Sequence, residues 1–301
     1  MSSTTTSTTS GERLDHYLVR TGHAVSRRDA TEMISRGAVR LNGKRGIKGA
    51  VVHAGDNVEV EALPALPAIE PERDLKIQII FEDAALIVVN KPGGVPCHPL
   101  RPGERGTVMN AVVARFPETA TIGYKPIEGG LIHRLDNGTS GTLMIARTAE
   151  AFAQLRPTLQ SGAIKRKYLA MVAGNVTTAL KLDTPIAHHP KNPRKMIVVP
   201  TESERAKLAP RPAFTRVEPI RRVGNFTLLS VMPSTGVRHQ IRVHLANAGF
   251  PIVGDELYGG PAASLATGRF WLHLSEIELE SPASGAIKVS APLPDDLTRL
   301  A

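Results

Sequence analysis

The sequence is poor in cysteine and has no long apolar run, and each shortage removes a class of protein. Cys97 is the only cysteine among 301 residues, so the chain can form no internal disulfide and offers no cysteine cluster for a metal. No apolar run reaches about 18 residues, the length that a membrane-spanning helix needs. The N-terminus also lacks the hydrophobic segment of a secretory signal. We therefore expect a cytoplasmic protein that does not associate with a membrane.

Positive charge is what the sequence has in excess. Lys and Arg number 37 against 28 Asp and Glu, which gives a net charge of +9 and a pI near 9.9. A surface of this sign favours a polyanionic partner such as a nucleic acid. An acidic membrane surface is the alternative, but the chain has no basic amphipathic helix of the kind that binds one. The hydrophobic content of 42% is ordinary for a globular protein.

The order of compositional changes predicts a small and a large domain. Residues 1–11 are rich in Ser and Thr and read as a disordered tail. Residues 12–62 have two short helical patterns and short strands, which indicates a small α/β domain. Three prolines fall in residues 63–74, so this stretch reads as a linker. Residues 75–301 carry more strands and hairpins than helices, which is typical of an α+β fold.

The most informative stretch surrounds Asp136. This residue follows His133 and Arg134 and precedes Asn137-Gly138, a dipeptide typical of turns. Apolar strand-like runs lie on both sides, so we expect Asp136 at the edge of a sheet. A carboxylate near a guanidinium stays ionised at neutral pH, which suits a nucleophile or a base. Taken alone, the same aspartate could equally cap loop amides.

Two better-known motifs look similar and do not fit. A kinase catalytic loop has Asp directly after His-Arg, whereas Leu135 intervenes here, and a nucleophile elbow needs one more residue than Gly138–Gly141 provides. The whole block, His133-Arg134-Leu135-Asp136 followed by Thr139-Ser140-Gly141, resembles the catalytic motif of the RluA-type (RluA/RluC/RluD-like) RNA pseudouridine synthases. The resemblance places Asp136 at that family's essential aspartate.

The N-terminal domain carries basic residues in a stretch that has few acids. Such a run is often only a solvated face of a domain. The pattern from Arg13 to Asp56 resembles, however, a small RNA-binding domain shared with a small-subunit ribosomal protein. In that family a helical pair and the adjacent loop hold RNA by its phosphates. The resemblance makes five cations candidate RNA contacts: Arg27, Arg28, Arg36, Arg40 and Lys44.

Two further blocks agree with the same family. Lys91-Pro92 opens a Pro/Gly turn after a predicted strand, where Lys91 is either a phosphate contact or a solvated charge. Tyr168 follows three basic residues, ending with Lys167, on a predicted strand. A tyrosine on a strand most often packs in a core, but one beside cations could stack on an unpaired base while Lys167 holds the RNA backbone. By resemblance, Tyr168 is the active-site tyrosine that packs against the target base.

Arg242 lies on a predicted helix near the C-terminal end. Arginines are common on helix surfaces, so the helix alone does not make Arg242 functional. The segment from His239 to Leu245 nevertheless resembles the family's third motif, whose arginine pairs with the catalytic aspartate. The chain departs from that motif at Val237-Arg238, where the family usually has Arg followed by a small hydroxyl residue. His239 and His244 are five residues apart, not the four of a zinc-binding helix, so we expect no metal.

The resemblance implies an α+β catalytic domain on a long mixed, mainly antiparallel sheet. It implies conversion of uridine to pseudouridine in RNA without a cofactor, with large-subunit ribosomal RNA favoured by the extra domain, in a protein we expect to be a monomer. Asp136, Tyr168 and Arg242 would be catalytic, and Arg134 would contact or replace the flipped nucleotide. The alternatives are an RNA-binding or ribosome-assembly factor that only keeps the fold, and a metal-dependent hydrolase, for which the sequence lacks a ligand set.

Overall fold

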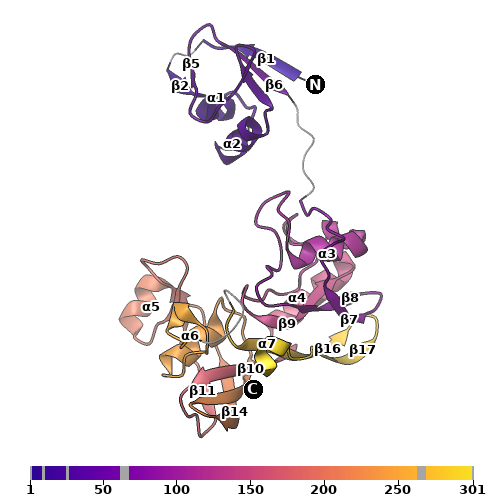
Figure 1. Cartoon of the computed structure of the whole chain (residues 1–301), viewed down its shortest axis with the longest axis vertical. Coiled ribbons are helices and arrows are strands. Elements are labelled where there is room, and N and C mark those ends of the chain that lie inside the picture. The colour runs from indigo at the N-terminus through magenta and orange to yellow at the C-terminus, as the bar shows by residue number, and fades with distance from the viewer. Residues whose placement is uncertain (1, 9–10, 25–26, 62–67, 263–268, 300–301) are drawn as a thin grey trace. The chain divides into compact units, whose positions relative to one another are not determined.

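A computed structural model of the chain describes residues 2–8, 11–24, 27–61, 68–262 and 269–299, without the side chains of Ser2, Ser3, Arg28 and Asp29. Contacts between Cα atoms divide the chain into a first unit of residues 1–66 and a second of residues 67–301. Figure 1 shows both units, with many of their elements labelled. No described helix is long and apolar enough to cross a membrane.

The first unit packs two helices on a small sheet. Helices α1 (Leu14–Arg20) and α2 (Arg27–Ser35) contribute the buried side chains Leu14, Leu18 and Ala30. The larger sheet has the order β1-β6-β3-β4, and a separate ladder joins β2 to β5. The strands are β1 (Ser2–Thr6), β2 (Glu12–Arg13), β3 (Val39–Leu41), β4 (Lys44–Arg45), β5 (Val51–Val52) and β6 (Asn57–Glu61).

The N-terminal segment differs from the disordered tail that we expected. Ser2–Thr6 forms strand β1, which pairs antiparallel with β6 from Ser2–Glu61 to Thr6–Asn57. Threonine is branched at Cβ and suits an extended chain, and β6 offers it a free edge. Low hydrophobicity therefore did not prevent pairing, because the backbone of β6 supplies the hydrogen bonds.

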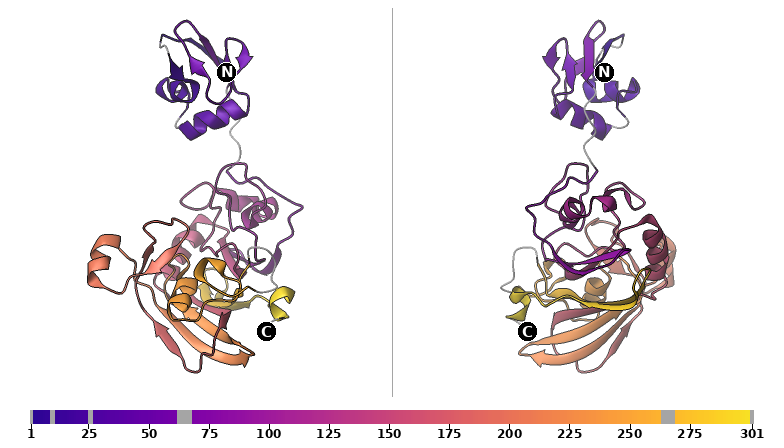
Figure 2. Two further views of the ribbon diagram at one scale, coloured as in Figure 1. Left: turned by 60° about the vertical axis from the view of Figure 1, so that its left-hand side comes forward. Right: turned by 90° about the vertical axis from the view of Figure 1, so that its right-hand side faces the viewer.

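The second unit is built on one nine-stranded sheet. Its order is β11-β14-β15-β10-β16-β9-β8-β7, with β17 paired to β16, and only β16 and β9 run parallel. This matches the mixed, mainly antiparallel sheet that we predicted; Figure 2 shows it from two further sides. The strands are β7 (Gln78–Glu82), β8 (Leu86–Lys91), β9 (Ser140–Ala146), β10 (Lys165–Ala173), β11 (Leu180–Leu182), β14 (Thr215–Val223), β15 (Phe226–Pro233), β16 (Leu272–Ser281) and β17 (Gly285–Ser290).

Strand β9 lies in the middle of the apolar core. All seven of its residues are buried, between β8 on one side and β16 on the other. Fully burying a side chain of the size of Leu, Ile or Met contributes about 1.5–3 kcal/mol, so this strand is a rigid base for the loop that precedes it. That loop contains Asp136.

Helices cover parts of both ends of the sheet. The Thr107 side chain caps α3 (Val108–Arg115). The Thr148 side chain caps α4 (Ala149–Gln160), a helix that contains Pro157. Helix α6 (Gln240–Asn247) packs on β14 and β15 and on the small β12–β13 ladder. The remaining elements are β12 (Ile186–His188), β13 (Met196–Val198), α5 (Glu202–Leu208), α7 (Asp295–Thr298) and the 3-10 turns η1 (Pro117–Thr121) and η2 (Glu256–Tyr258).

The stretch that we expected to be a linker belongs partly to the second unit. Residues 63–67 of it lie outside the described residues. Ile69 is only 3% exposed within the large core, and the Asn110 side chain donates to the Glu70 carbonyl. The Glu72 amide also donates to the Asn110 carbonyl, so hydrogen bonds to α3 and the buried Ile69 attach this part of the stretch to the second unit.

Candidate active site

Asp136 lies in a tight turn at the start of β9. The chain enters as an extended segment in which Leu131 bridges Ile145, and the Thr139 amide then donates to the Asp136 carbonyl at 3.0 Å. This hydrogen bond closes the turn that Asn137-Gly138 predicted. The Asp136 side chain is 25% exposed, so its carboxylate stands at the edge of the sheet and remains accessible.

The loop after β8 fixes the backbone around Asp136. The Gly94 amide donates to the Asn137 carbonyl at 2.8 Å, and the Cys97 thiol lies 3.3 Å from both the amide and the carbonyl of Leu135. The ammonium of Lys91 donates to the carbonyls of Asn137 and Thr139 at 3.1 and 2.8 Å. The residues on both sides of Asp136 are therefore held by a segment about 40 residues earlier in the chain.

Lys91 must be corrected from an RNA contact to an internal support. Its side chain is fully buried, and the carbonyl of Pro92 accepts a third hydrogen bond from it at 2.8 Å. Burial lowers the pKa of Lys91 to about 8. All three protons of the ammonium are used inside the protein, so none is left for a phosphate. Neither the phosphate contact nor the solvated charge that we considered describes this residue.

Arg242 pairs with Asp136, as the sequence predicted. One guanidinium nitrogen donates to Asp136 Oδ2 at 2.9 Å, across 106 residues of chain. The Nε and Nη2 edge of the guanidinium donates two hydrogen bonds to the Asp255 carboxylate, of 2.7 and 2.8 Å. Burial would lower the pKa of Arg242, but the hydrogen bonds and negative charge of Asp255 and Asp136 outweigh it and raise the pKa. The cation is therefore permanent.

Aromatic rings keep the guanidinium of Arg242 in place. Its central carbon lies 4.2 Å from the centroid of Phe270 and 5.1 Å from that of Tyr258, close enough for cation–π attraction. The Arg242 side chain is only 7% exposed and that of Asp255 only 1%. The sequence analysis did not identify Asp255 and Phe270 as parts of the site.

Tyr168 lies on β10 with its ring buried. The residue is 7% exposed and pairs with Val231 of β15 and Leu274 of β16, beside a bulge at Lys167. Burial raises the pKa of Tyr168; the positive charge of Arg166 opposes this shift, and the negative charge of Asp136 adds to it. Among the described residues the hydroxyl has no hydrogen-bond partner, so it is free to meet a ligand.

Two of the predicted cations, Arg134 and Lys167, are exposed, whereas Arg166, next to Lys167 in the chain, is buried. Arg134 is exposed, two residues before Asp136 in the chain, and its Nη1 lies 3.4 Å from His98 Nε2. Lys167 is also exposed, but alternation along β10 turns it to the face opposite Tyr168, across from Glu276. Arg166 is buried and donates to the carbonyls of Pro233 and Thr235.

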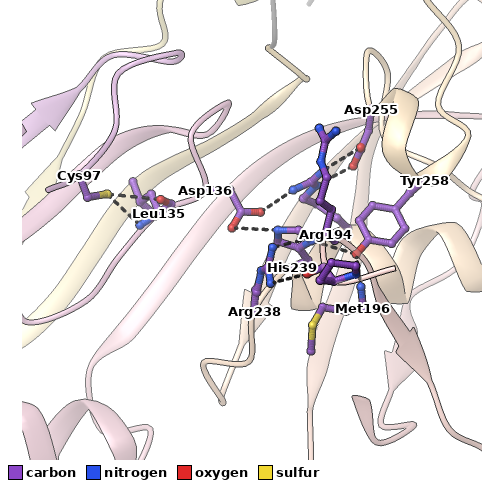
Figure 3. A network of polar contacts seen from close by, with 11 residues as sticks. Cys97, Leu135, Asp136, Arg194, Met196, Arg238, His239, Asp255 and Tyr258 are labelled. Carbon is purple, nitrogen blue, oxygen red and sulfur yellow. Dashed lines mark hydrogen bonds and ion pairs between the residues drawn. The ribbon is translucent and has the colours of Figure 1, made fainter. Parts of the chain in front are cut away.

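His239 is a neighbour of Asp136 that the sequence did not reveal as functional. Its Nε2 lies 3.9 Å from Asp136 Oδ1, and its Nδ1 lies 2.9 Å from the hydroxyl of Tyr258, which accepts from the Met196 amide at 2.8 Å. Figure 3 shows Asp136, His239, Tyr258 and Met196 as one chain of polar contacts. Burial lowers the pKa of His239 to about 4, so the ring is neutral.

Val237 and Arg238, where the sequence departs from the family motif, both make contacts that stabilise the structure near the site. Val237 is buried in a small core with Ile186, Met196, Ala213 and Val243. Arg238 is exposed and donates to the carbonyls of Pro193 and Arg194, at 3.1 and 3.4 Å. It therefore holds the basic loop between β12 and β13 next to the site, with Lys191 and Arg194 on the surface.

The cations of the first unit are mostly on its surface. Arg27 is exposed but pairs with the buried Asp15 at 3.3 Å, so it also stabilises the domain. The side chain of Arg28 lies outside the described residues. The remaining candidates are exposed: Arg36, Arg40 and Lys44. Among the described residues, no group of three or more His, Cys, Asp or Glu side chains could hold a metal ion.

Comparisons with known proteins agree with this geometry. A family model described as RNA pseudouridylate synthase matches residues 85–247, and the S4 domain model matches residues 12–58. The ribosomal large subunit pseudouridine synthase D of Pseudomonas aeruginosa is 32% identical over 95% of this chain and 90% of its own length. The protein of that name from Xanthomonas campestris is 33% identical over 96% of this chain and 88% of its own length.

A solved structure shares the fold. The human RNA pseudouridylate synthase domain containing 1 aligns with a TM-score of 0.56 at 23% identity, over 75% of this chain and 87% of its own. The resemblance found at the Asp136 motif thus extends to nearly the whole sequence. This chain, with an S4 domain before its catalytic domain, belongs to the RNA pseudouridylate synthase family.

Proposed function

We propose that this protein converts uridine to pseudouridine in large-subunit ribosomal RNA and that Asp136 is its catalyst. The ion pair between Asp136 and Arg242 is the observation that carries the proposal, because it joins two distant segments at an accessible edge of the sheet. The relatives from Pseudomonas aeruginosa and Xanthomonas campestris, which span nearly the whole chain, are named for the ribosomal large subunit. They support the choice of RNA and, with it, a place in the cytoplasm.

The reaction is an isomerisation. The bond between N1 of uracil and C1′ of ribose breaks, the ring rotates, C5 bonds to C1′, and C5 loses its proton while N1 gains one. Asp136 supplies the anionic oxygen that starts this sequence, by adding to a carbon or by accepting a proton. Arg242 keeps that oxygen ionised and in place through a charge-assisted hydrogen bond.

The base must leave its helix before it can react. Flipping a uridine out of a stack costs a few kcal/mol, which the protein has to supply by binding. Tyr168 offers a buried ring face to hold the detached uracil, and Arg134 is placed to contact the flipped nucleotide. Asp136, Tyr168 and Arg242 all come from one chain, which is consistent with a functional monomer.

The exposed cations hold the RNA by its phosphates. On the catalytic unit we assign this role to Arg134, Lys191 and Arg194, and on the S4 domain to Arg36, Arg40 and Lys44. Contacts of this kind position the RNA without reading its sequence. Removing the S4 domain should therefore weaken RNA binding at moderate salt more than it slows a saturated reaction, and an unchanged binding curve would remove the domain from this role.

Replacing Asp136 by Asn tests the catalytic assignment. The amide keeps the size of the side chain but cannot act as a nucleophile or base, so release of tritium from uridine labelled at C5 should stop. Affinity for the RNA should stay within about tenfold, because it depends on many phosphate contacts. A variant that still releases tritium would show that Asp136 is not the catalyst. A wild-type protein that binds RNA but never releases tritium would favour the assembly-factor alternative.

A further inference from the structure

The second oxygen of Asp136 faces a histidine. Arg242 occupies Oδ2 at 2.9 Å, while Oδ1 lies 3.9 Å from Nε2 of His239. A direct hydrogen bond between nitrogen and oxygen needs about 3 Å, so these two atoms do not bond to each other. An oxygen atom placed about 2.8 Å from each of them would bond to both.

The hydrogen-bond network assigns the ring proton of His239 to Nε2. The Tyr258 hydroxyl accepts from the Met196 amide, and it lies 2.9 Å from Nδ1 of His239. Burial raises the pKa of Tyr258, so the phenol keeps its proton and donates it to Nδ1. A neutral imidazole with an accepting Nδ1 carries its proton on Nε2. That N–H points toward Asp136 Oδ1.

The backbone at His239 supports a functional role for this arrangement. The residue has φ 54° and ψ 19°, the left-handed region, at the position directly before helix α6. Residues other than glycine adopt this region uncommonly, although His, Asn and Asp do so more often than the rest, and residues in sparsely populated regions cluster at functional sites. With this backbone conformation the His239 ring lies against Tyr258 and near Asp136.

A group between these two atoms has to accept from one and donate to the other. A single hydroxyl oxygen does both, whereas the carbonyls of uracil only accept and its N3–H only donates. In an RNA chain the 3′ and 5′ oxygens of a nucleotide are esterified, so its one free hydroxyl is at C2′. We propose that His239 Nε2–H and Asp136 Oδ1 bind the 2′-hydroxyl of the target nucleotide.

This inference rests on the proposed function and extends it to the choice of sugar. His239 would be a binding residue that makes the site prefer ribose over deoxyribose, since the 2′-hydroxyl is the group that distinguishes RNA from DNA. Tyr258 would be a positioning residue, because it acts only through the tautomer of His239. The two roles predict different responses to substitution.

The experiment compares two oligonucleotides that differ only at the target sugar. One carries uridine and the other 2′-deoxyuridine, and single-turnover rates and dissociation constants are measured for both. His239→Asn suits the left-handed backbone, and its amide is too short to reach Asp136. It should lower the rate on the ribose substrate by about 10–100-fold and change that on the deoxyribose substrate by less than about threefold.

Tyr258→Phe keeps the ring beside Arg242 and removes only the hydroxyl. It should lower the ribose rate by about 3–10-fold, with little change for deoxyribose, because Nδ1 then competes for the proton. Nitrogen-15 spectra of the histidines should show the Nε2–H tautomer at His239 in the wild type and its partial loss in this variant. Tyr124→Phe, at a ring that is 69% exposed, is the control and should change neither rate.

The outcomes separate this inference from the proposed function. A wild type that makes no pseudouridine from the ribose substrate would overturn the function. An active wild type whose His239→Asn variant loses equal factors on both substrates would overturn only the 2′-hydroxyl assignment and leave His239 a structural residue. If deoxyribose turnover is too slow to measure, the ratio of the two dissociation constants decides in the same way, since the variant should bring it toward one.

Discussion

Replacing Arg242 by Met should destabilise the catalytic unit strongly. The Asp255 side chain is 1% exposed and has Arg242 as its cation, through hydrogen bonds of 2.7 and 2.8 Å. Methionine keeps an apolar stem between Phe270 and Tyr258 but leaves a buried carboxylate without its partner. Removing one member of a buried ion pair costs about 3–5 kcal/mol, so the free energy of unfolding should fall by about that amount.

A second substitution separates stability from catalysis. Asp255→Asn in the Arg242→Met background replaces the unpaired charge with a neutral amide. Exchanging both members of a buried pair is often nearly neutral, so the double variant should recover to within about 2 kcal/mol of the wild type. Its activity should not recover, because Asp136 still lacks the cation that holds it.

Urea unfolding followed by tryptophan emission measures the stability of the single and the double variant. Trp271 is the one tryptophan in the chain and is fully buried beside Phe270, so its emission reports on the catalytic unit alone. Arg216→Met is the matched control, since Arg216 pairs with Glu218 on the surface, at 64% and 41% exposure, and should cost less than about 1 kcal/mol. The reasoning fails if Arg242→Met costs as little as the control, or if the double variant is as unstable as the single one.

Three further predictions concern protonation and backbone geometry. Burial lowers the pKa of Lys91 from 10.5 to about 8, so the unfolded chain binds the Lys91 proton more tightly than the folded protein does. The free energy of unfolding should therefore rise by about 3 kcal/mol between pH 8 and pH 10.5. Urea unfolding curves of Lys91→Met should lack that rise. Burial lowers the pKa of His133 to about 3 and that of His273 to about 4, below the 6.5 of a free histidine. The free energy of unfolding should therefore fall as the pH drops from 6.5 toward 4. The melting temperature of His273→Asn should depend less on pH in this range, and an equal dependence in variant and wild type would contradict the reasoning. A Cβ atom at Gly141, where φ is +117°, would lie 2.1 Å from the Leu274 carbonyl oxygen. Gly141→Ala should therefore lower the free energy of unfolding in urea by more than about 3 kcal/mol. The control Gly224→Ala, where no atom lies within 4 Å of the added Cβ, should lower it by about 1 kcal/mol.

Local sequence patterns were enough to predict several elements of the catalytic unit, including those that carry Asp136 and Arg242. The turn at Asn137-Gly138, the hairpin between β14 and β15 and the helix that carries Arg242 each follow from residues close together in sequence. The pairing of Arg242 with Asp136 followed from the family resemblance, because helical spacing alone does not say which residue an arginine meets. The same resemblance singled out Tyr168 as a candidate site residue, whereas its position on a strand alone favoured a role in core packing.

Contacts between distant segments were beyond reach of the sequence. Lys91 reads as a surface charge, since lysine is rarely buried, and only the carbonyls of the Asp136 loop make its burial possible. His239 reads as one more histidine in a motif, because its left-handed backbone and its bond to Tyr258 come from tertiary packing. Ser2–Thr6 reads as a tail because pairing with β6 depends on the partner, not on its own composition.

The parallel pairing of β9 with β16 has a consequence for the order of synthesis. It consists of two residue pairs, Ser140–His273 and Gly141–Leu274, and it joins the part of the sheet that carries Asp136 to the part that carries Tyr168. Translation makes the acid 106 residues before its cation, and Phe270 and β16 come later still. The two parts of the sheet can therefore join only after β16 has been synthesised, so Asp136 and Arg242 must wait in separate segments until that strand is available.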